Sequence, residues 1–237
     1  MEVHEPYSRN EGNMDKNFIM NIRTNKLDPN LVQKWRENYP REVSYVSKRL
    51  MDIMKLLKER GIFDNSLIPV TSDHGQLLGE HGRISHGTFL YDELLRVPLL
   101  IKYPQEYNIE LTNQTSKYIS LTRLRQFILD VIDNKIKDDK ILYETTIFSE
   151  SYGVHQNVGK LTNEKERKNV EQLEKYRIAS YHDNFKGIFN VEDWKFESII
   201  SCNPDIEITE DIIKRMKKSV LKFLKMSTAP KLSRIEL

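Results

Sequence analysis

The sequence of 237 residues contains one cysteine, Cys202, so an internal disulfide is excluded. The cysteine count therefore gives no evidence for secretion. No run approaches the ~20 apolar residues of a membrane-spanning helix, so no span is predicted. No early apolar stretch resembles a signal peptide, and we therefore expect a cytoplasmic protein. The net charge is only +2, from 37 basic and 35 acidic residues, which gives no reason to expect nucleic acid as a partner.

The apolar content is also low, at 38%, while 30% of the residues are charged. A chain of this length can form one large domain, or a domain plus a smaller one. A low apolar content fits a chain that lacks part of a buried sheet, and it equally fits a charged soluble protein. Composition alone leaves both interpretations open.

The most informative segment is Asp73-His74-Gly75, which ends the apolar run 67–71. A carboxylate beside an imidazole at the carboxyl end of a predicted strand is well placed to bind a metal ion, because open α/β sheets bind ligands at that edge. The glycine that follows allows the backbone to turn sharply. Glu80-His81-Gly82 and His86-Gly87 come shortly afterwards.

The first part of the chain shows helical periodicity. Residues 8–28 are polar and predict a surface loop, after which Asp28-Pro29 can start a helix over about 29–38. A second helix is predicted from Pro40 to about residue 60. Its apolar stripe is expected to pack on a sheet and consists of Val43, Val46, Leu50, Ile53, Met54 and Leu57.

Strands alternate with helices further along the chain. Strands are predicted at 67–71, 97–102 and 145–150, with a helix over about 87–95. A polar stretch at 156–175 predicts an exposed loop or a charged helix. A hairpin of 176–181 and 185–190 follows, and then a closing helix over 209–225, capped by Thr209.

This alternation predicts an α/β fold. We expect a mixed, mostly parallel sheet flanked by helices over residues 1–150. A smaller α+β region with the hairpin and the terminal helix is expected over residues 151–237. Glu150, at a strand end, is a weak site candidate, and the basic side of the closing helix is interpreted as a solvated face.

Several motifs occur together in an order that resembles the sulfatases of the alkaline phosphatase superfamily. They are Val3-His4-Glu5-Pro6-Tyr7, Thr71-Ser72-Asp73-His74-Gly75, Leu78-Gly79-Glu80-His81-Gly82, His86-Gly87, Leu90-Tyr91-Asp92-Glu93 and Arg96-Val97-Pro98-Leu99-Leu100-Ile101. The resemblance runs from residue 2 to about residue 130 and is weak beyond residue 140. It implies an alkaline-phosphatase/sulfatase-like fold.

The same resemblance shows what the sequence does not contain. Family members begin with a strand that ends in paired metal-binding aspartates. A C/S-x-P-x-R motif follows, and its Cys or Ser becomes the formylglycine nucleophile of active sulfatases. Neither occurs here, and Cys202 lacks the arginine of that motif. The chain therefore resembles the carboxyl-terminal half or more of a sulfatase, and a separate chain is one source of the amino-terminal half.

The resemblance assigns roles to four residues. Asp73 and His74 match metal ligands, and the ion is a divalent metal: calcium in full-length family members, with manganese or zinc also suited to a histidine-containing site. Two protein ligands alone predict weak binding or none. His4 matches a histidine that assists the leaving group, and His86 stands where many sulfatases have a lysine that contacts the sulfate. His81 is expected to shape the loop around the site.

Three functions follow as hypotheses. The first is a truncated sulfuric ester hydrolase that carries half of a metal-dependent site and acts on a small sulfate or phosphate ester. The second is a phosphoric or phosphonic ester hydrolase of the same superfamily, since a histidine in place of the lysine leaves that preference open. The third is a non-catalytic remnant or anion-binding module, which would fold but not turn over any ester.

Overall fold

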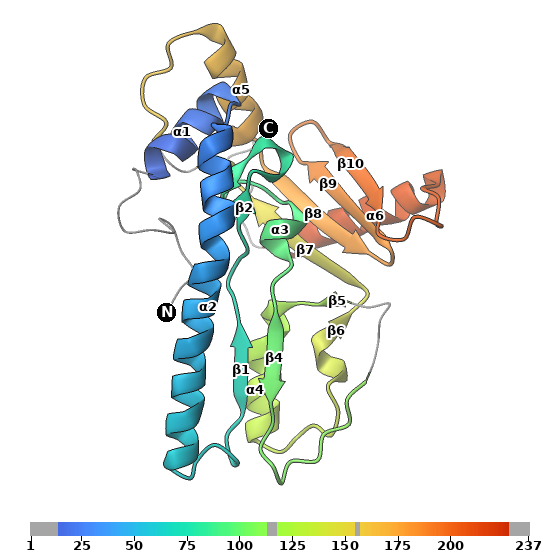
Figure 1. Cartoon of the computed structure of the whole chain (residues 1–237). Helices are drawn as coiled ribbons and strands as arrows, with labels where there is room; N and C mark the ends of the chain where they lie inside the picture. The colour runs from blue at the N-terminus through green and yellow to red at the C-terminus, as the bar shows by residue number, and fades with distance from the viewer. Residues whose placement is uncertain (1–13, 113–117, 155–156, 228–237) are drawn as a thin grey trace. The chain divides into compact units, whose positions relative to one another are not determined.

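The computed structural model describes residues 14–112, 118–154 and 157–227 (Figure 1). These residues divide into two compact units that alternate along the chain. Unit 1 holds the described residues up to Tyr107 and those between Val154 and Glu174. Unit 2 holds those of Asn108–Gly153 and those from Lys175 onward. The predicted domain boundary at residue 150 stays a prediction.

Unit 1 combines helices with very short strands. Its helices are α1 (Met14–Thr24), α2 (Pro29–Glu59), α3 (Asp92–Leu95), α5 (Glu164–Glu174) and the 3-10 turn η1 (Glu80–Gly82). Its strands are β1 (Ile68–Thr71), β2 (Leu77–Leu78), β3 (Ile84–Ser85) and β4 (Leu99–Lys102). Among the described residues, no helix is both long and apolar enough to cross a membrane.

Helix α2 begins as the sequence predicts. The Asp28 side chain accepts a hydrogen bond from the Asn30 N–H, and Pro29 occupies the first turn. The predicted break at Pro40 is wrong, because α2 continues through it. Pro40 removes one backbone donor from the helix, while Trp35 and Tyr39 in the preceding turn pack in the core of unit 1.

The predicted loop at 8–28 is wrong where α1 forms, and residues 8–13 lie outside the described part. Helix α1 lies beside α5 (Figure 1). Phe18 and Ile22 of α1 are buried with Val170 of α5. Packing against a segment far along the chain therefore overrides the polar local sequence.

The prediction of one mixed, mostly parallel sheet is wrong. Strands β1 and β4 pair antiparallel, with Thr71 opposite Leu99, and the strand near 145–150 belongs to a different sheet. Parallel neighbours need a crossover of a dozen or more residues, usually a helix. Here the chain between β1 and β4 forms the antiparallel β2–β3 pair and the four-residue α3, which leaves most of the predicted 87–95 helix unformed.

The β1–β4 pair is anchored at its far end by a lysine. The Lys102 Nζ donates to the carbonyl oxygens of Phe63, Asp64 (2.7 Å) and Ser66 (3.2 Å), in the loop that follows α2. It also lies 4.6 Å from the centre of the Phe63 ring. This cation therefore ties the end of β4 to the chain entering β1.

The predicted apolar stripe of α2 is only partly buried. After Asn38 no residue of α2 is fully buried, and Val43 and Ile53 of the stripe are exposed, while Val46, Leu50, Met54 and Leu57 are half-buried. The core of unit 1 lies instead at the other end of the helix. It consists of Phe18, Ile22, Trp35, Leu77, Ile84, Phe89, Leu94 and Val170.

Unit 2 has an antiparallel sheet in the order β10-β9-β8-β7. The four strands of this sheet are β7 (Thr146–Ser151), β8 (Arg177–His182), β9 (Phe185–Asn190) and β10 (Lys195–Ser201). Unit 2 also has a separate pair of strands, β5 (Tyr118–Ile119) and β6 (Tyr143–Glu144). Its helices are η2 (Leu121–Arg123), α4 (Leu124–Ile132), η3 (Lys140–Leu142) and α6 (Glu210–Met226). The predicted β8–β9 hairpin is confirmed, with His182 opposite Phe185.

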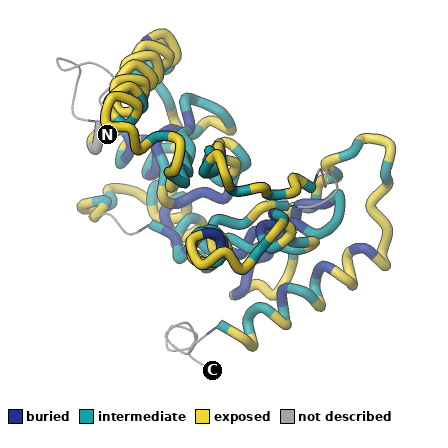
Figure 2. The backbone as a smooth tube through the Cα atoms, turned by 90° about the horizontal axis from the view of Figure 1, so that it is seen from below, coloured by how far each residue is buried: buried dark blue, intermediate teal, exposed yellow. Residues whose placement is uncertain are grey.

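The closing helix is also confirmed, because the Thr209 side chain accepts a hydrogen bond from the Ile212 N–H at the start of α6. Figure 2 shows buried and exposed residues alternating along α6, which leads to the carboxyl terminus. Ile212, Met216 and Val220 form the buried side of α6. Met216 packs with Phe185 of β9, and Val220 packs with Phe189.

Candidate metal and ester site

Asp73 and His74 lie in a tight turn directly after β1. The Ser72 Oγ donates to the His74 carbonyl oxygen at 2.7 Å, and the His74 N–H donates to Asp73 Oδ1 at 3.0 Å. These local bonds fix both side chains at the strand end. The Asp73 carboxylate remains 79% exposed, so it is open to a ligand from solvent.

The charge state of Asp73 favours cation binding. Burial raises the pKa of Asp73, but nearby His74 and the N–H groups of Asp73 and His74 outweigh it and hold the pKa below its usual value. The carboxylate is therefore ionised at neutral pH.

The tautomer of His74 follows from its hydrogen bond. Its Nδ1 lies 2.8 Å from the Gly75 carbonyl oxygen, which can only accept, so Nδ1 carries the proton. In its neutral form, the ring presents the Nε2 lone pair, and Nε2 lies 3.9 Å from Asp73 Oδ2. That separation is within reach of two bonds of roughly 2.3–2.6 Å to one calcium ion.

The structure brings His86 to the same place. The rings of His74 and His86 are stacked, with centroids 4.0 Å apart and planes inclined by 20°. The His86 Nδ1 lies 3.2 Å from Gln76 Oε1, an acceptor, so this nitrogen is the donor. Asp73, His74 and His86 are thus gathered beyond the end of β1.

Gly75 is required for close packing and not for the sharp turn that the sequence predicted. A Cβ at this position would lie 1.9 Å from the Glu93 carbonyl oxygen and 3.2 Å from the Leu94 Cα. The close approach lets the Gly75 N–H donate to the Leu94 carbonyl at 2.8 Å and the Gln76 N–H to the Glu93 carbonyl at 3.0 Å. The site turn is therefore held against α3.

The loop between His74 and His86 is pinned from several sides. His81 Nε2 lies 3.1 Å from each carboxylate oxygen of Glu93, and its ring stacks on Tyr91 at 3.8 Å. Its backbone is left-handed, with φ 55°. These contacts agree with the loop-shaping role expected of His81.

Helices α1 and α2 hold the other side of this loop. The Arg36 Nε donates to the Leu78 carbonyl at 2.8 Å, and its Nη2 pairs with Glu80 at 3.0 Å. The buried Asn21 donates to the Gly82 carbonyl at 3.0 Å. The return path that brings His86 back to His74 is therefore built by long-range contacts.

Other predicted site residues fall elsewhere. His4 lies outside the described residues. Glu150 belongs to unit 2, where it accepts hydrogen bonds from the hydroxyls of Tyr176 and Tyr152. Among the residues that the structure describes, no group of three or more His, Cys, Asp or Glu could hold a metal ion. Asp73 and His74 offer two donor groups of the kind that a metal prefers, and their role as metal ligands stays a prediction.

Sequence reasoning missed two residues that organise this site. Gln76 contacts His86, and Glu93 holds both His81 and the backbone of Gln76. In the sequence, Glu93 lies within the helix predicted over about 87–95 and was given no role in the site. A signal was present in each case: Gln76 follows the metal motif directly, and Glu93 is a carboxylate in the same group of motifs.

The family model described as "Sulfatase" matches residues 1–134, which is more than half of the chain. The chain belongs to the sulfatase family. It is 35% identical over 89 residues to N-acetylglucosamine-6-O-sulfatase of Bacteroides thetaiotaomicron, covering 38% of this chain and 15% of that protein. It is 35% identical over 72 residues to iduronate 2-sulfatase of Mus musculus, covering 30% of this chain and 13% of that protein. This sulfatase-family chain thus spans a small part of these relatives.

Solved structures support the fold. A phosphonate monoester hydrolase from Silicibacter pomeroyi matches with a TM-score of 0.59 at 18% identity, covering 85% of this chain and 43% of that chain. A protein solved in complex with D-glucosamine-2-N,6-O-disulfate matches with a TM-score of 0.55 at 20% identity, covering 82% of this chain and 40% of that one. The expected likeness to the alkaline-phosphatase/sulfatase fold is confirmed, although its large parallel sheet is not seen among the described residues.

Proposed function

We propose that this chain supplies one half of a sulfuric ester hydrolase site, and that a polypeptide outside it supplies the nucleophile. The observation that carries the proposal is the stacking of His74 on His86 beside Asp73, at the end of β1. Asp73 and His74 are the proposed ligands of a divalent metal, with calcium first and manganese or zinc next. When bound, such an ion would neutralise the ester oxygens and stabilise the charge that develops as the ester bond breaks.

His86 is the proposed contact to the ester. When it is protonated, its Nδ1–H stays on Gln76 while its Nε2–H donates to an ester oxygen. His4 is proposed to give a proton to the leaving group, as the resemblance of its motif implies. The substrate class is a small sulfate ester.

A phosphoric or phosphonic ester is the second candidate substrate. The likeness in fold to a phosphonate monoester hydrolase favours it, as does a histidine at the position of the usual lysine. The identity of the missing nucleophile discriminates between the two classes, since cysteine in C-x-P-x-R favours sulfate while serine leaves both open.

Activity is the first measurement. The purified 237-residue chain should hydrolyse aryl sulfates and aryl phosphates at the background rate, because its sequence has no C/S-x-P-x-R motif to supply the activated nucleophile. Robust turnover by the chain alone, abolished by Asp73→Ala, would contradict the half-site and indicate a different active site.

Metal binding is the second measurement. Isothermal titration with calcium or manganese chloride should give a dissociation constant on the order of millimolar, because water fills the remaining positions. Asp73→Ala and His74→Ala should each abolish the signal. His182→Ala, which removes an imidazole from unit 2, is the matched control and should leave it unchanged. Tight binding that survives both site substitutions would refute these ligands.

A further inference from the structure

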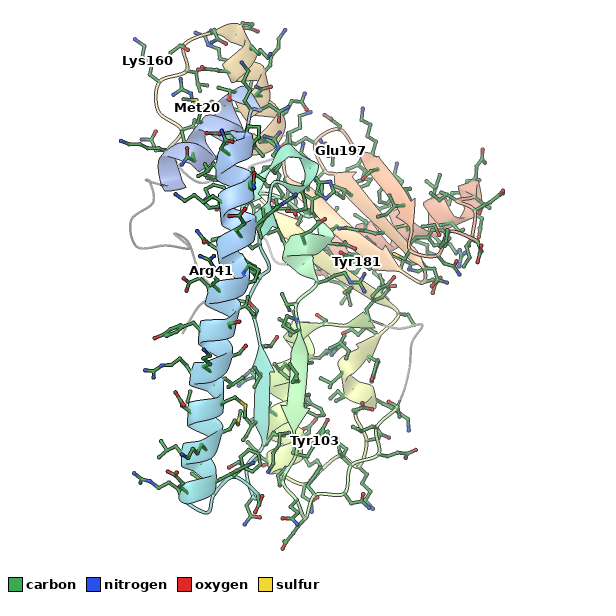
Figure 3. All side chains as sticks on the ribbon, viewed as in Figure 1. Met20, Arg41, Tyr103, Lys160, Tyr181 and Glu197 are labelled. Carbon is green, nitrogen blue, oxygen red and sulfur yellow. The ribbon has the colours of Figure 1, made fainter. Side chains whose placement is uncertain are left out.

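Helix α6, whose side chains are drawn at the right of Figure 3, carries positive charge that is not mixed with negative charge. Between Ile212 and Met226 it has no Asp or Glu, and its six basic residues are Lys214, Arg215, Lys217, Lys218, Lys222 and Lys225. Helix α5, by contrast, mixes four acidic with three basic residues. Charges of both signs are typical of a solvated helix face. A solvated face, the interpretation from the sequence, therefore does not explain the charge of α6.

Four of the lysines are exposed and form one row along α6. This lysine row consists of Lys214, Lys218, Lys222 and Lys225. Residues spaced by four, four and three positions lie on one side of a helix, and at about 1.5 Å per residue the row is roughly 16 Å long. The opposite side of the helix, centred on Met216, is buried in unit 2. The lysine row therefore faces solvent.

Little of the charge of the lysine row is balanced within the described part of the chain. Lys214 pairs only loosely with Glu210, at 3.9 Å between side chains that are 79% and 91% exposed. Among the described residues, no carboxylate lies within ion-pair distance of Lys218, Lys222 or Lys225. The helix dipole favours cations in the last turn, which accounts for Lys225 alone. The row is therefore available to an anionic partner.

We propose that the lysine row binds the surface of a lipid bilayer that contains anionic phospholipids. Clusters of four or more basic residues on an amphipathic helix bind such surfaces, and each basic residue near the surface strengthens binding about fivefold. The binding is peripheral, because the apolar side of α6 is already buried with Phe185 of β9 and is not free to insert into the bilayer. The surface uses none of the residues of the candidate ester site.

Two features favour a bilayer over a soluble polyanion such as a nucleic acid. Met226, four residues after Lys222 and so on the same side of α6, is 73% exposed. A bilayer can bury this apolar side chain at the boundary of its acyl chains, whereas a soluble polyanion cannot. The second feature is that the row consists of lysines, which act as point charges and lack the bidentate geometry that suits nucleic-acid phosphates. The arginine in this stretch, Arg215, is engaged with Asp211 at 3.0 Å and Asp183 at 3.6 Å.

Vesicle flotation with the complete 237-residue chain tests the proposal. The chain should bind vesicles of phosphatidylcholine mixed with phosphatidylglycerol, and not vesicles of phosphatidylcholine alone. Binding should fall steeply between about 0.1 M and about 1 M salt, since the Debye length shortens from about 10 Å to about 3 Å. Lys218→Gln with Lys222→Gln should weaken binding about 25-fold, at about fivefold per lysine. The matched control, Lys135→Gln with Lys140→Gln, removes the same charge from exposed lysines elsewhere in unit 2 and should change binding less than twofold.

A further variant separates the bilayer from a soluble polyanion. Met226→Gln should weaken vesicle binding severalfold and leave binding to linear polyphosphate unchanged. The circular dichroism of every variant should match that of the wild type, which shows that weaker binding is not unfolding of α6. Four results would overturn the proposal: equal binding to both kinds of vesicle, an equal loss in the control variant, vesicle binding that Met226→Gln leaves unchanged, or a chain that binds polyphosphate but no vesicles.

Discussion

Replacing Gly75 by alanine should destabilise unit 1 strongly. The new Cβ would lie 1.9 Å from the Glu93 carbonyl oxygen, which is backbone and cannot rotate away. The site turn would have to move from α3, and this strains the two hydrogen bonds from Gly75 and Gln76. Overpacking costs about 1–3 kcal/mol and each of the two weakened hydrogen bonds about 1 kcal/mol, so we expect a loss of roughly 3–5 kcal/mol.

The fluorescence of Trp35 can report this loss for unit 1 alone. Trp35 is buried in unit 1, whereas Trp194 lies in unit 2, so a Trp194→Phe background leaves a single reporter. With a slope of about 2 kcal/mol per molar urea, the unfolding midpoint should fall by roughly 1.5–2.5 M.

The matched control for Gly75→Ala is Gly61→Ala. Gly61 has a left-handed φ of 67°, but a Cβ there would meet no atom within 4 Å. Its substitution should therefore cost only the backbone strain, about 1 kcal/mol. A midpoint shift for Gly75→Ala that is no larger than that of Gly61→Ala would refute the close-approach argument.

Two further predictions concern a lysine and a tyrosine. Lys102→Met removes a cation from three carbonyls of the 63–66 loop, and the same Trp35 assay should show a loss of about 2 kcal/mol; an unchanged midpoint would contradict this anchoring. Burial is the main cause that raises the pKa of Tyr176 far above the ordinary value of 10.0, and the hydrogen bond to Glu150 is the second cause. The neutral phenol therefore stabilises unit 2 fully below pH 10.0, and this stabilisation is lost progressively as the pH rises above 10.0. Urea unfolding of unit 2, followed by Trp194 fluorescence from about pH 9 to 11, should decline less steeply in Tyr176→Phe than in the wild type, and equal slopes would argue against a buried phenol.

Elements governed by local chemistry could be predicted from the sequence. The hairpin of β8 and β9 has turn residues between two apolar runs, and α6 has a threonine cap before an apolar stripe. The start of α2 at Asp28 and Pro29 is of the same kind. In each case the signal lies within a few residues of the structure that it determines.

Elements that depend on distant partners could not be predicted in this way. Nothing near α1 shows that α5 covers Phe18 and Ile22, and the stripe of α2 gives no sign that none of its residues becomes fully buried. The same holds for the pairing of β1 with β4, because a strand pattern does not name its neighbour.

The candidate site, too, could be predicted from the sequence only in part. Motif order was enough to place Asp73, His74 and His86 in one site as a hypothesis, and the structure brings their side chains together. Their metal and ester roles stay predictions. The contacts of Gln76 and Glu93 depend on how the loop folds back on itself, which spacing alone does not reveal.

The docking of α5 on α1 has a consequence for how the chain folds during its synthesis. Arg23 pairs with Glu166, 143 positions away, at 2.7 Å, and Asn169 caps the Arg23 carbonyl. A chain leaving the ribosome must therefore expose Phe18 and Ile22 until α5 has been translated, long after the residues of the candidate site. Because this contact of unit 1 joins residues 143 positions apart, unit 1 should be the slower of the two units to fold, and a nascent chain stalled before residue 164 should be captured by chaperones.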